Sequence, residues 1–260
     1  MYKLWIAPAA LLLLAGCTRT VTLTPAVQHS QYSIQVEMPA TINAGDSLPL
    51  RVSVFSGGAL RDVYADYRML HIVIASEDLQ DITHTNSPQP VANGVFEVTH
   101  TFTRSGRYKI WGELGDVRVL DHHDEQADII ANAAFTVGGT SVSTQDSLEH
   151  SQRATVGDAT VVIGPAVIRA GEKVPFTVSV HDANDKPVSL LPPEGANYAI
   201  TGNNLDYFRH GHLLTEKDQQ RVSIPNTFPV AGTYVLWVDT FPVMNGQVQS
   251  REGRFLFEVR

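Results

Sequence analysis

Histidine and methionine side chains recur in this chain at spacings that place them on one face of a strand. Met69 and His71 are two residues apart, and His210 and His212 repeat that spacing. Side chains two apart on a β-strand point to the same face of the sheet, and His84 follows His71 after the next turn. Imidazole nitrogens combined with a thioether sulfur suit copper, and Cu(I) in particular. The pattern therefore predicts a metal site at Met69, His71 and His84, with His210 and His212 as a second pair.

A structural role for these histidines stays open. His71 can simply pack on an apolar sheet, because buried histidines are often satisfied by backbone hydrogen bonds. The run from His122 to Glu125 is the densest group of ligand-type side chains, but a solvated loop is the simpler explanation. His100 lies at an inward-facing position of its strand, where the second half of the chain has Asn226. A polar group at one shared inward position indicates a buried hydrogen bond, not a binding site.

Two tryptophans suggest a surface for a protein partner. Trp111 and Trp237 have the opposite parity to the core positions Ile110 and Leu236, so they point to the outer face of the sheet. Outward aromatic residues at equivalent places are typical of a docking surface. Cover by the preceding loop is the alternative.

Composition and motifs exclude several classes of function. The 260 residues carry a formal charge of −8 with no basic run, so binding to nucleic acid is not expected. The single cysteine, Cys17, excludes an internal disulfide framework and a thiolate metal cluster. The chain has no G-x-S-x-G, no glycine-rich phosphate loop and no H-E-x-x-H. We therefore expect no enzymatic activity.

The elements that must position these side chains come from an internal repeat. Ten of the 19 positions from Val36 to Val54 are identical to the residues that lie 126 positions later. The same offset pairs His84 with His210 and Trp111 with Trp237, without a gap. The chain is therefore predicted to contain two copies of one domain.

Within each copy the apolar residues alternate with polar ones, as in half-buried strands. Leu48, Leu50, Val52 and Val54 show this period of two, and turn signals such as Asn93-Gly94 separate the runs. No segment shows a sustained helical stripe. Short antiparallel strands over about 105 residues predict an all-β immunoglobulin-like sandwich for each copy.

Each copy also contains a motif that resembles the tyrosine corner of immunoglobulin-like domains. Tyr108 and Tyr234 each follow a glycine by two residues and precede an apolar core residue. This resemblance implies that both rings are buried and that each hydroxyl bonds to nearby backbone.

The first residues resemble the signal peptide of bacterial lipoproteins. Lys3 precedes an apolar stretch that is too short to cross a bilayer, and Leu14-Ala15-Gly16-Cys17 resembles the lipobox of that family. The resemblance implies that Cys17 is acylated and becomes the N-terminus, anchored to a membrane. The residue after Cys17 is Thr18. In enterobacterial lipoproteins an aspartate at this position favours retention in the inner membrane, so its absence favours the periplasm-facing outer membrane. A plain cleaved signal is the alternative.

A second resemblance concerns the histidines. Met69 to Leu79, followed by His84, resembles bacterial secreted domains of the YtkA-like type, in which a histidine enters an apolar strand and a histidine-rich stretch follows. That family is discussed beside heavy-metal handling. The chain departs from its H-x-H-P ending at His84-Thr85-Asn86, and Asn197 replaces His71 in the second copy.

Together these patterns predict a lipid-anchored, non-catalytic envelope protein whose tandem sandwiches form a binding module, with copper as the possible ligand. The alternative is a structural spacer or assembly protein of an envelope complex that binds no small ligand. The predicted units are a signal peptide and lipobox at 1–17, a polar tether at 18–31, a first sandwich at 32–138, a linker at 139–155 and a second sandwich at 156–260.

Overall fold

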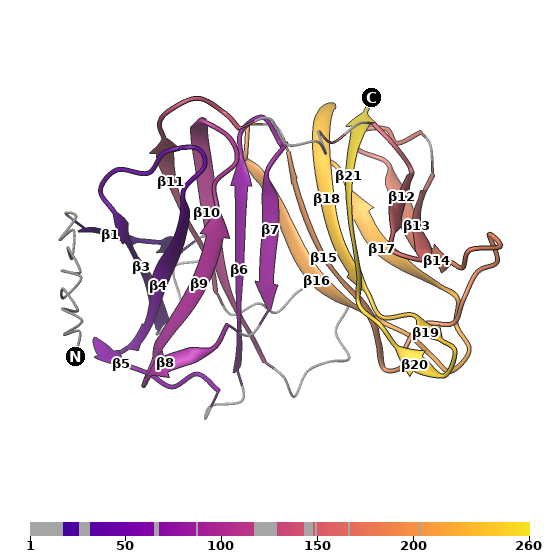
Figure 1. The fold of residues 1–260 in the computed structure, drawn as a ribbon, viewed down its shortest axis with the longest axis horizontal. Coiled ribbons are helices and arrows are strands. Elements are labelled where there is room, and N and C mark those ends of the chain that lie inside the picture. The colour runs from indigo at the N-terminus through magenta and orange to yellow at the C-terminus, as the bar shows by residue number, and fades with distance from the viewer. Residues whose placement is uncertain are drawn as a thin grey trace, which may run out of the picture.

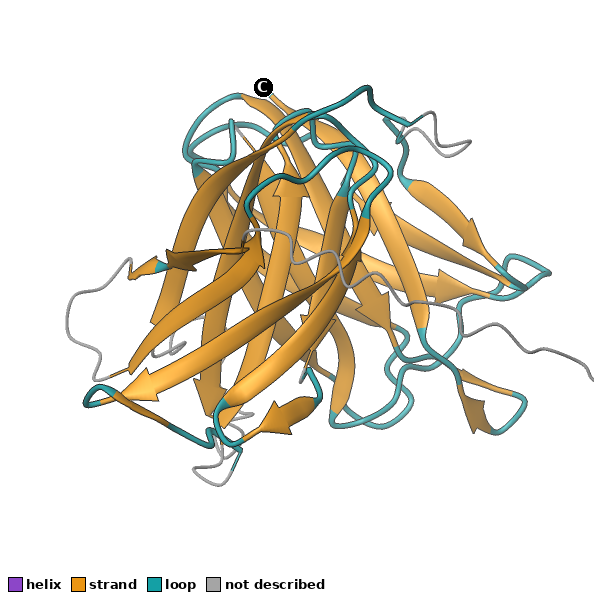
Figure 2. Cartoon of the chain, turned by 60° about the vertical axis from the view of Figure 1, so that its left-hand side comes forward, coloured by secondary structure: helices purple, strands orange, loops and turns teal. Residues whose placement is uncertain are grey.

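The structure is a computed structural model that describes residues 18–25, 32–64, 68–86, 88–116, 129–142, 148, 150–165, 167–202 and 204–260. Every regular element in these ranges is a β-strand (Figure 2), and all pairings between the named strands are antiparallel. The predicted all-β class and the tandem immunoglobulin-like sandwiches are confirmed. Over the described ranges, the chain has no helix that is long and apolar enough to cross a membrane.

The first sandwich consists of two sheets. One has the strand order β1-β3-β4-β9-β8, with β5 paired to β4, and the other has the order β2-β11-β10-β6-β7. The first sheet contains β1 (Thr18–Thr22), β3 (Tyr32–Pro39), β4 (Ser47–Ser56), β5 (Ala59–Leu60), β8 (Pro90–Ala92) and β9 (Val95–Thr101). The second contains β2 (Thr24–Pro25), β6 (Arg68–Ser76), β7 (Ile82–Asn86), β10 (Gly106–Asp116) and β11 (Ile129–Val137).

The second sandwich repeats this plan with the orders β12-β13-β14-β17 and β16-β15-β18-β21, and a small hairpin, β19-β20, is added. Its first sheet contains β12 (Arg153–Val156), β13 (Ala159–Gly164), β14 (Lys173–His181) and β17 (Arg221–Thr227). Its second sheet contains β15 (Glu194–Gly202), β16 (Tyr207–Leu214), β18 (Gly232–Thr240) and β21 (Arg251–Val259). The hairpin consists of β19 (Val243–Met244) and β20 (Gln247–Val248).

Each sandwich has its own hydrophobic core, as the period-two pattern predicts. In β4, Leu50, Val52 and Val54 are buried, while Arg51 is exposed and Ser53 is half-buried. Because alternate side chains of a strand point to opposite faces, one face enters the core and the other is left for a second use. In β6 and β10 that second face is also buried, and this is what builds the site described below.

The tyrosine corners are present in both copies. Tyr108 and Tyr234 are fully buried. The Arg104 amide donates to the Tyr108 hydroxyl at 3.0 Å, and the Tyr234 hydroxyl donates to the Val230 carbonyl at 2.9 Å. The prediction of a buried ring with a backbone-bonded hydroxyl is therefore confirmed for both residues.

The prediction of a free tether at 18–31 is wrong for its first part. β1 pairs with β3 and β2 pairs with β11, so this segment adds an edge strand to both sheets of the first sandwich. The physical reason is Leu23, which is fully buried in the core between the two short strands. Threonine and valine flank it, and such β-branched residues favour strands.

The two sandwiches pack together through the outer faces of β6, β7 and β10 on one side and β15, β16, β18 and β21 on the other (Figure 1). This third hydrophobic cluster joins equivalent positions of the two copies. The equivalent pairs are Val73 and Ala199, Leu79 and Leu205, Ile82 and Phe208, and Trp111 and Trp237. A contact made by the same patch on both partners is isologous, the arrangement of a two-fold dimer.

Two leucines show how closely the copies agree. Leu79 and Leu205 have φ angles of 59° and 65°, in the left-handed region that few residues other than glycine adopt. Both side chains are buried in the cluster between the sandwiches. The two copies thus share the same unusual backbone conformation at the residue that each contributes to this cluster.

Candidate metal centre

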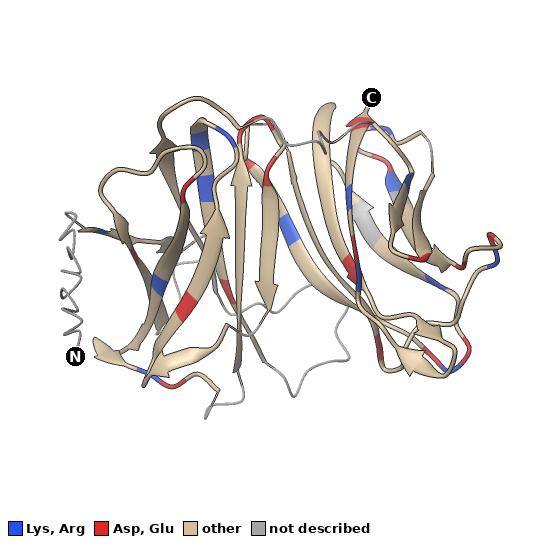
Figure 3. Ribbon diagram, in the orientation of Figure 1, with Lys and Arg blue, Asp and Glu red and all other residues tan. Residues whose placement is uncertain are grey.

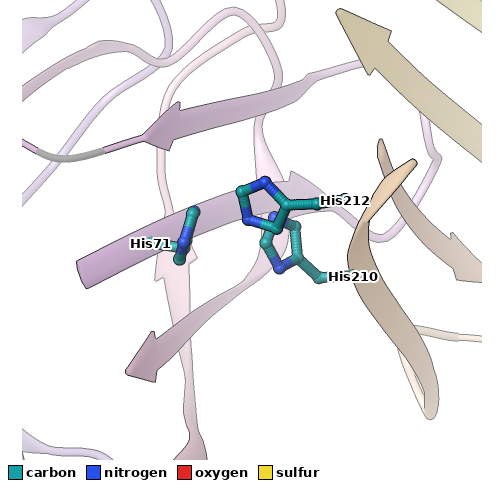
Figure 4. A group of neighbouring side chains, drawn as sticks. All are labelled: His71, His210 and His212. Carbon is teal, nitrogen blue, oxygen red and sulfur yellow. The ribbon is translucent and has the colours of Figure 1, made fainter. Parts of the chain in front are cut away.

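Four histidines meet inside the contact between the sandwiches. His71 comes from β6 and His84 from β7 of the first sandwich, whereas His210 and His212 both come from β16 of the second. Figure 4 shows the rings of His71, His210 and His212 side by side, projecting from opposite sandwiches. The spacing predicted one site at Met69, His71 and His84 and a separate pair at His210 and His212, and the structure unites the four histidines in one group.

The strand period explains why these side chains face the contact. In β6, Leu70, Ile72 and Ile74 enter the core of the first sandwich, so His71 and Val73 must point the other way. In an isolated sandwich this second face would be exposed to water. Packing against the other sandwich leaves His71 and His210 with exposed fractions of 2% and 7%.

The rings are close enough to act as one ligand set. His71 Nδ1 and His84 Nε2 are 3.3 Å apart. The His71 ring centroid lies 4.5 Å from that of His210 and 5.0 Å from that of His212. One ligand nitrogen each from His71, His210 and His212 lies within 4.8 Å of the other two. Tetrahedral coordination at about 2 Å needs nitrogen separations of about 3.3 Å, so the separations would have to shorten by at most about 1.5 Å.

Two carboxylates orient two of these rings. His210 Nδ1 lies 3.0 Å from Glu113 Oε2, and His212 Nδ1 lies 2.9 Å from Glu194 Oε1. A histidine that donates from Nδ1 to a carboxylate keeps the lone pair on Nε2, which is the arrangement of metal-binding histidines. His210 Nε2 is buried and has no hydrogen-bond partner in the described part of the chain.

Burial keeps three of the four imidazoles neutral, as metal ligands must be. Loss of hydration lowers the pKa of His71, His84 and His210 well below the usual value, and the neighbouring histidines lower it further. Burial raises the pKa of Glu113, against the attraction of the nearby histidines. A bound cation would compensate the charge of this buried carboxylate.

The other predicted ligand, Met69, lies on β6 at the same parity as His71. It pairs with Gly115 and is half-buried. The group that converges, from His71, His210 and His212, offers imidazole nitrogens. The donors that converge are therefore nitrogens, which shifts the expected metal from Cu(I) toward Cu(II) or Zn(II).

The predicted partner surface at the tryptophans requires a correction. Trp111 and Trp237 do point outward from their own sheets, as their parity predicts, but each is 4% exposed or less. Trp111 stacks on Phe208 with centroids 4.7 Å apart, and Trp237 lies 4.6 Å from His84. Each tryptophan is covered by the other sandwich of the same polypeptide. The surface they form is therefore closed to an external partner.

His100 is buried at its inward position, as predicted, but the predicted buried hydrogen bond is not made by its Nε2, which has no hydrogen-bond partner in the described part of the chain. Its Nε2 lies 3.5 Å from Asp81 Oδ2, too far for a good hydrogen bond but close enough for electrostatic attraction. The same carboxylate accepts hydrogen bonds from Tyr108 and Thr103. Two further predictions, acylation of Cys17 and the group from His122 to Glu125, concern residues that lie outside the described ranges.

Sequence reasoning missed the two carboxylates and the joint nature of the site. Glu113 has the outward parity of Trp111, and its equivalent in the second copy is Asp239. An acidic residue at the same outward position in both copies was a usable signal. Glu194 lies beside a bulge in β15, where no period could indicate its direction.

Comparison with known proteins identifies no family. No family model matches the chain, and no curated protein matches it. The tetra-tandem repeat from the extending region of a large adhesion protein is 11% identical, with a TM-score of 0.28, over 93% of this chain and 50% of that one. A DUF4785 family protein from Legionella pneumophila is 12% identical, with a TM-score of 0.29, over 89% and 57%.

A third structure, the ICAM-5 D1–D4 ectodomain fragment, is 14% identical with a TM-score of 0.24, over 88% of this chain and 60% of that one. The chain thus spans half to three fifths of the length of these proteins. TM-scores at this level carry no inference about function. The resemblance to YtkA-like domains stays a prediction.

Proposed function

We propose that this chain is a non-catalytic binding module that holds one Cu(II) or Zn(II) ion between its two sandwiches. The observation that carries the proposal is the group of His71, His210 and His212 inside the contact, two of them buried and His212 half-buried, with two rings oriented by carboxylates. Imidazole suits both metals. Burying His71, His84 and His210, two of them with a ring nitrogen that lacks a hydrogen-bond partner among the described residues, is unfavourable unless something compensates, and a coordinated ion supplies that compensation.

The proposal has a direct test in variants that the chain itself suggests. His71→Asn and His212→Asn each introduce the residue that the other copy carries at the equivalent position, Asn197 and Asn86. Both variants should therefore fold. In calorimetric titrations of metal-free protein with Cu(II) and with Zn(II), wild type should bind one ion, and each variant should bind at least about 100-fold more weakly. His150→Gln is the control, since this histidine is 53% exposed and lies outside the group.

A spacer without a ligand is the second candidate, and the apolar contact between the sandwiches favours it. That contact buries Trp111, Trp237 and Leu205 and joins the two units into one body. Wild-type protein that binds neither metal would support the spacer and exclude the binding module.

The absence of catalysis is part of the proposal, although one group of residues has the composition of a hydrolase triad. Ser179 Oγ lies 3.2 Å from His181 Nε2, and His181 Nδ1 lies 3.1 Å from Asp185 Oδ1. Ser179 lies on the central strand β14, between β13 and β17, whose ladders engage the backbone amides that an oxyanion hole would need. Asp185 is 65% exposed and also pairs with Arg153. We expect no hydrolysis of p-nitrophenyl acetate above that of a Ser179→Ala variant.

We further propose that Cys17 is acylated and anchors the module in the cell envelope, as the lipobox resemblance implies. The described residues carry interspersed acidic and basic side chains on both sandwiches, which suits a water-exposed body (Figure 3). Cys17→Ala should release the protein from membrane fractions or leave its signal peptide uncut. Unchanged membrane association of this variant would exclude the lipid anchor.

A further inference from the structure

The two copies carry one equivalent histidine each at the centre of their contact, and these two are treated differently. His84 and His210 occupy the same position in the repeat, and their ring centroids are 4.7 Å apart. Contact between equivalent residues is what a local two-fold axis produces. Symmetry alone would give both rings the same partners, but the hydrogen bonds differ.

The difference lies in the acidic residue of the neighbouring strand. Glu113 in β10 reaches His210 of the other sandwich at 3.0 Å. Its equivalent in β18 is Asp239, which is one methylene shorter and accepts a hydrogen bond from Ser250 Oγ at 2.6 Å. His84 Nδ1 is buried and has no hydrogen-bond partner among the residues that the structure describes.

We infer that Glu113 is a positioning residue that selects His210, and not the equivalent His84, as a ligand of the proposed metal site. By accepting a hydrogen bond from Nδ1–H, Glu113 holds the His210 ring in the tautomer that presents the Nε2 lone pair. His84 Nε2 instead faces His71 Nδ1 at 3.3 Å, so it orients His71 in the same way that Glu113 orients His210. Two of the ligand rings thus depend on a carboxylate and one depends on a neutral imidazole.

The unequal contribution of the two copies to the group of ligands follows from residues that differ between them. The ligand candidates are His71 from the first copy and the pair His210 and His212 from the second. At the equivalents of His71 and His212 the chain has Asn197 and Asn86. Of the three equivalent pairs of polar positions, 84 and 210 carry the same side chain, whereas 71 and 197, and 86 and 212, do not. One group of ligands results, with His71 from the first sandwich and His210 and His212 from the second.

The inference rests on the proposed function, but its first test needs no metal. Long-range proton–nitrogen NMR correlations on the full-length, metal-free protein report which ring nitrogen of His210 carries the proton. Wild type should show protonated Nδ1 and bare Nε2. In Glu113→Leu, and in Glu113→Gln whose amide can donate to Nδ1, the Nε2–H tautomer should appear. Protonated Nε2 in wild type, or an unchanged tautomer in both variants, would overturn the inference.

The second test uses Cu(II) affinity and the visible spectrum of the bound ion. Loss of a residue that orients a ligand typically weakens binding by about 10–100-fold, so Glu113→Gln should show that loss and a shifted d–d band. Asp239→Asn is the matched control and should match wild type in both measurements. Equal affinity in Glu113→Gln and wild type refutes the positioning role while the metal site stands. Wild type that binds no metal refutes the proposed function, and the tautomer still decides what Glu113 does.

Discussion

At the scale of single residues, Asp81 is the buried carboxylate on which the first sandwich depends. Its Oδ2 atom accepts hydrogen bonds from the Tyr108 hydroxyl at 2.7 Å and from the Thr103 amide at 3.0 Å. Burial by itself raises the pKa of Asp81, but the His100 ring and these hydrogen bonds outweigh it and lower the pKa below the usual value. The carboxylate is therefore ionised in the folded protein at neutral pH.

This pKa shift predicts how stability depends on pH. Because the folded pKa lies below the unfolded value of about 3.9, the contribution of Asp81 is fully present above that value and is lost as pH falls through the folded pKa. Asp81→Asn should cost about 1.5–3 kcal/mol at pH 7, the value of a hydrogen bond to a charged group. Urea unfolding at pH 7 and pH 3 should show a smaller difference between variant and wild type at the lower pH. An equal difference at both pH values would contradict the role of the charge.

The two tyrosine corners give a matched pair of predictions. The Tyr108 hydroxyl donates to a carboxylate, whereas the Tyr234 hydroxyl donates to the Val230 carbonyl at 2.9 Å. Hydrogen bonds to charged groups contribute about 1.5–3 kcal/mol and neutral ones about 0.5–1.5 kcal/mol. Tyr108→Phe should therefore destabilise the protein more than Tyr234→Phe in urea unfolding at pH 7. The reverse order would show that Asp81 is not the partner that matters.

At the scale of elements, the period of two predicted which face of each strand enters a core, but not what covers the other face. The sequence indicated that Trp111 and His71 point outward from their sheets. It could not indicate that the other copy lies against them, because a sandwich is complete without that contact. The edge strands β1 and β2 were missed for a different reason. The segment that contains them contributes one fully buried side chain, Leu23, and a single buried residue cannot establish a period.

The contact between these sheets should contribute strongly to stability. Trp111 is buried and stacks on Phe208 at an interplanar angle of 12°. Trp111→Ala should cost about 3–5 kcal/mol, the usual range for deleting a buried tryptophan side chain. Small-angle scattering should also show a larger radius of gyration, because the sandwiches lose part of their joint surface. Val248→Ala, at a side chain that is 47% exposed, serves as the control and should lie within about 0.5 kcal/mol of wild type.

At the scale of the whole molecule, the repeat predicted two sandwiches but not one site between them. Histidines that are far apart in sequence, such as His71 and His212, become neighbours only because the copies pack through equivalent faces. Nothing in the spacing of residues within a copy encodes that packing. For the same reason, the predicted site at Met69, His71 and His84 and the separate pair at His210 and His212 give way to a single group of histidines shared by both units.

A shared site makes metal binding and the packing of the sandwiches one equilibrium. Since His71 comes from one sandwich and His210 from the other, an ion that contacts both binds only while the sandwiches are packed together. A ligand that binds the folded state alone stabilises it by about 2.7 kcal/mol at a free concentration of 100 times Kd. Metal should therefore raise the stability of both sandwiches at once.

Scanning calorimetry at pH 7.5 tests this prediction, because the pKa values of the buried histidines lie below the usual range and the rings are neutral there. With Zn(II), the unfolding of the two sandwiches should shift to higher temperature and merge into a more cooperative transition. With chelator, the transition should be lower and broader. His71→Asn should fold but show no shift with zinc, since it removes the ligand from the first sandwich alone. Two results would contradict the prediction: a zinc-induced rise in unfolding temperature confined to one sandwich, or a rise in His71→Asn as large as in wild type. Either result would place the ion elsewhere and show that metal binding is not coupled to the packing of the sandwiches.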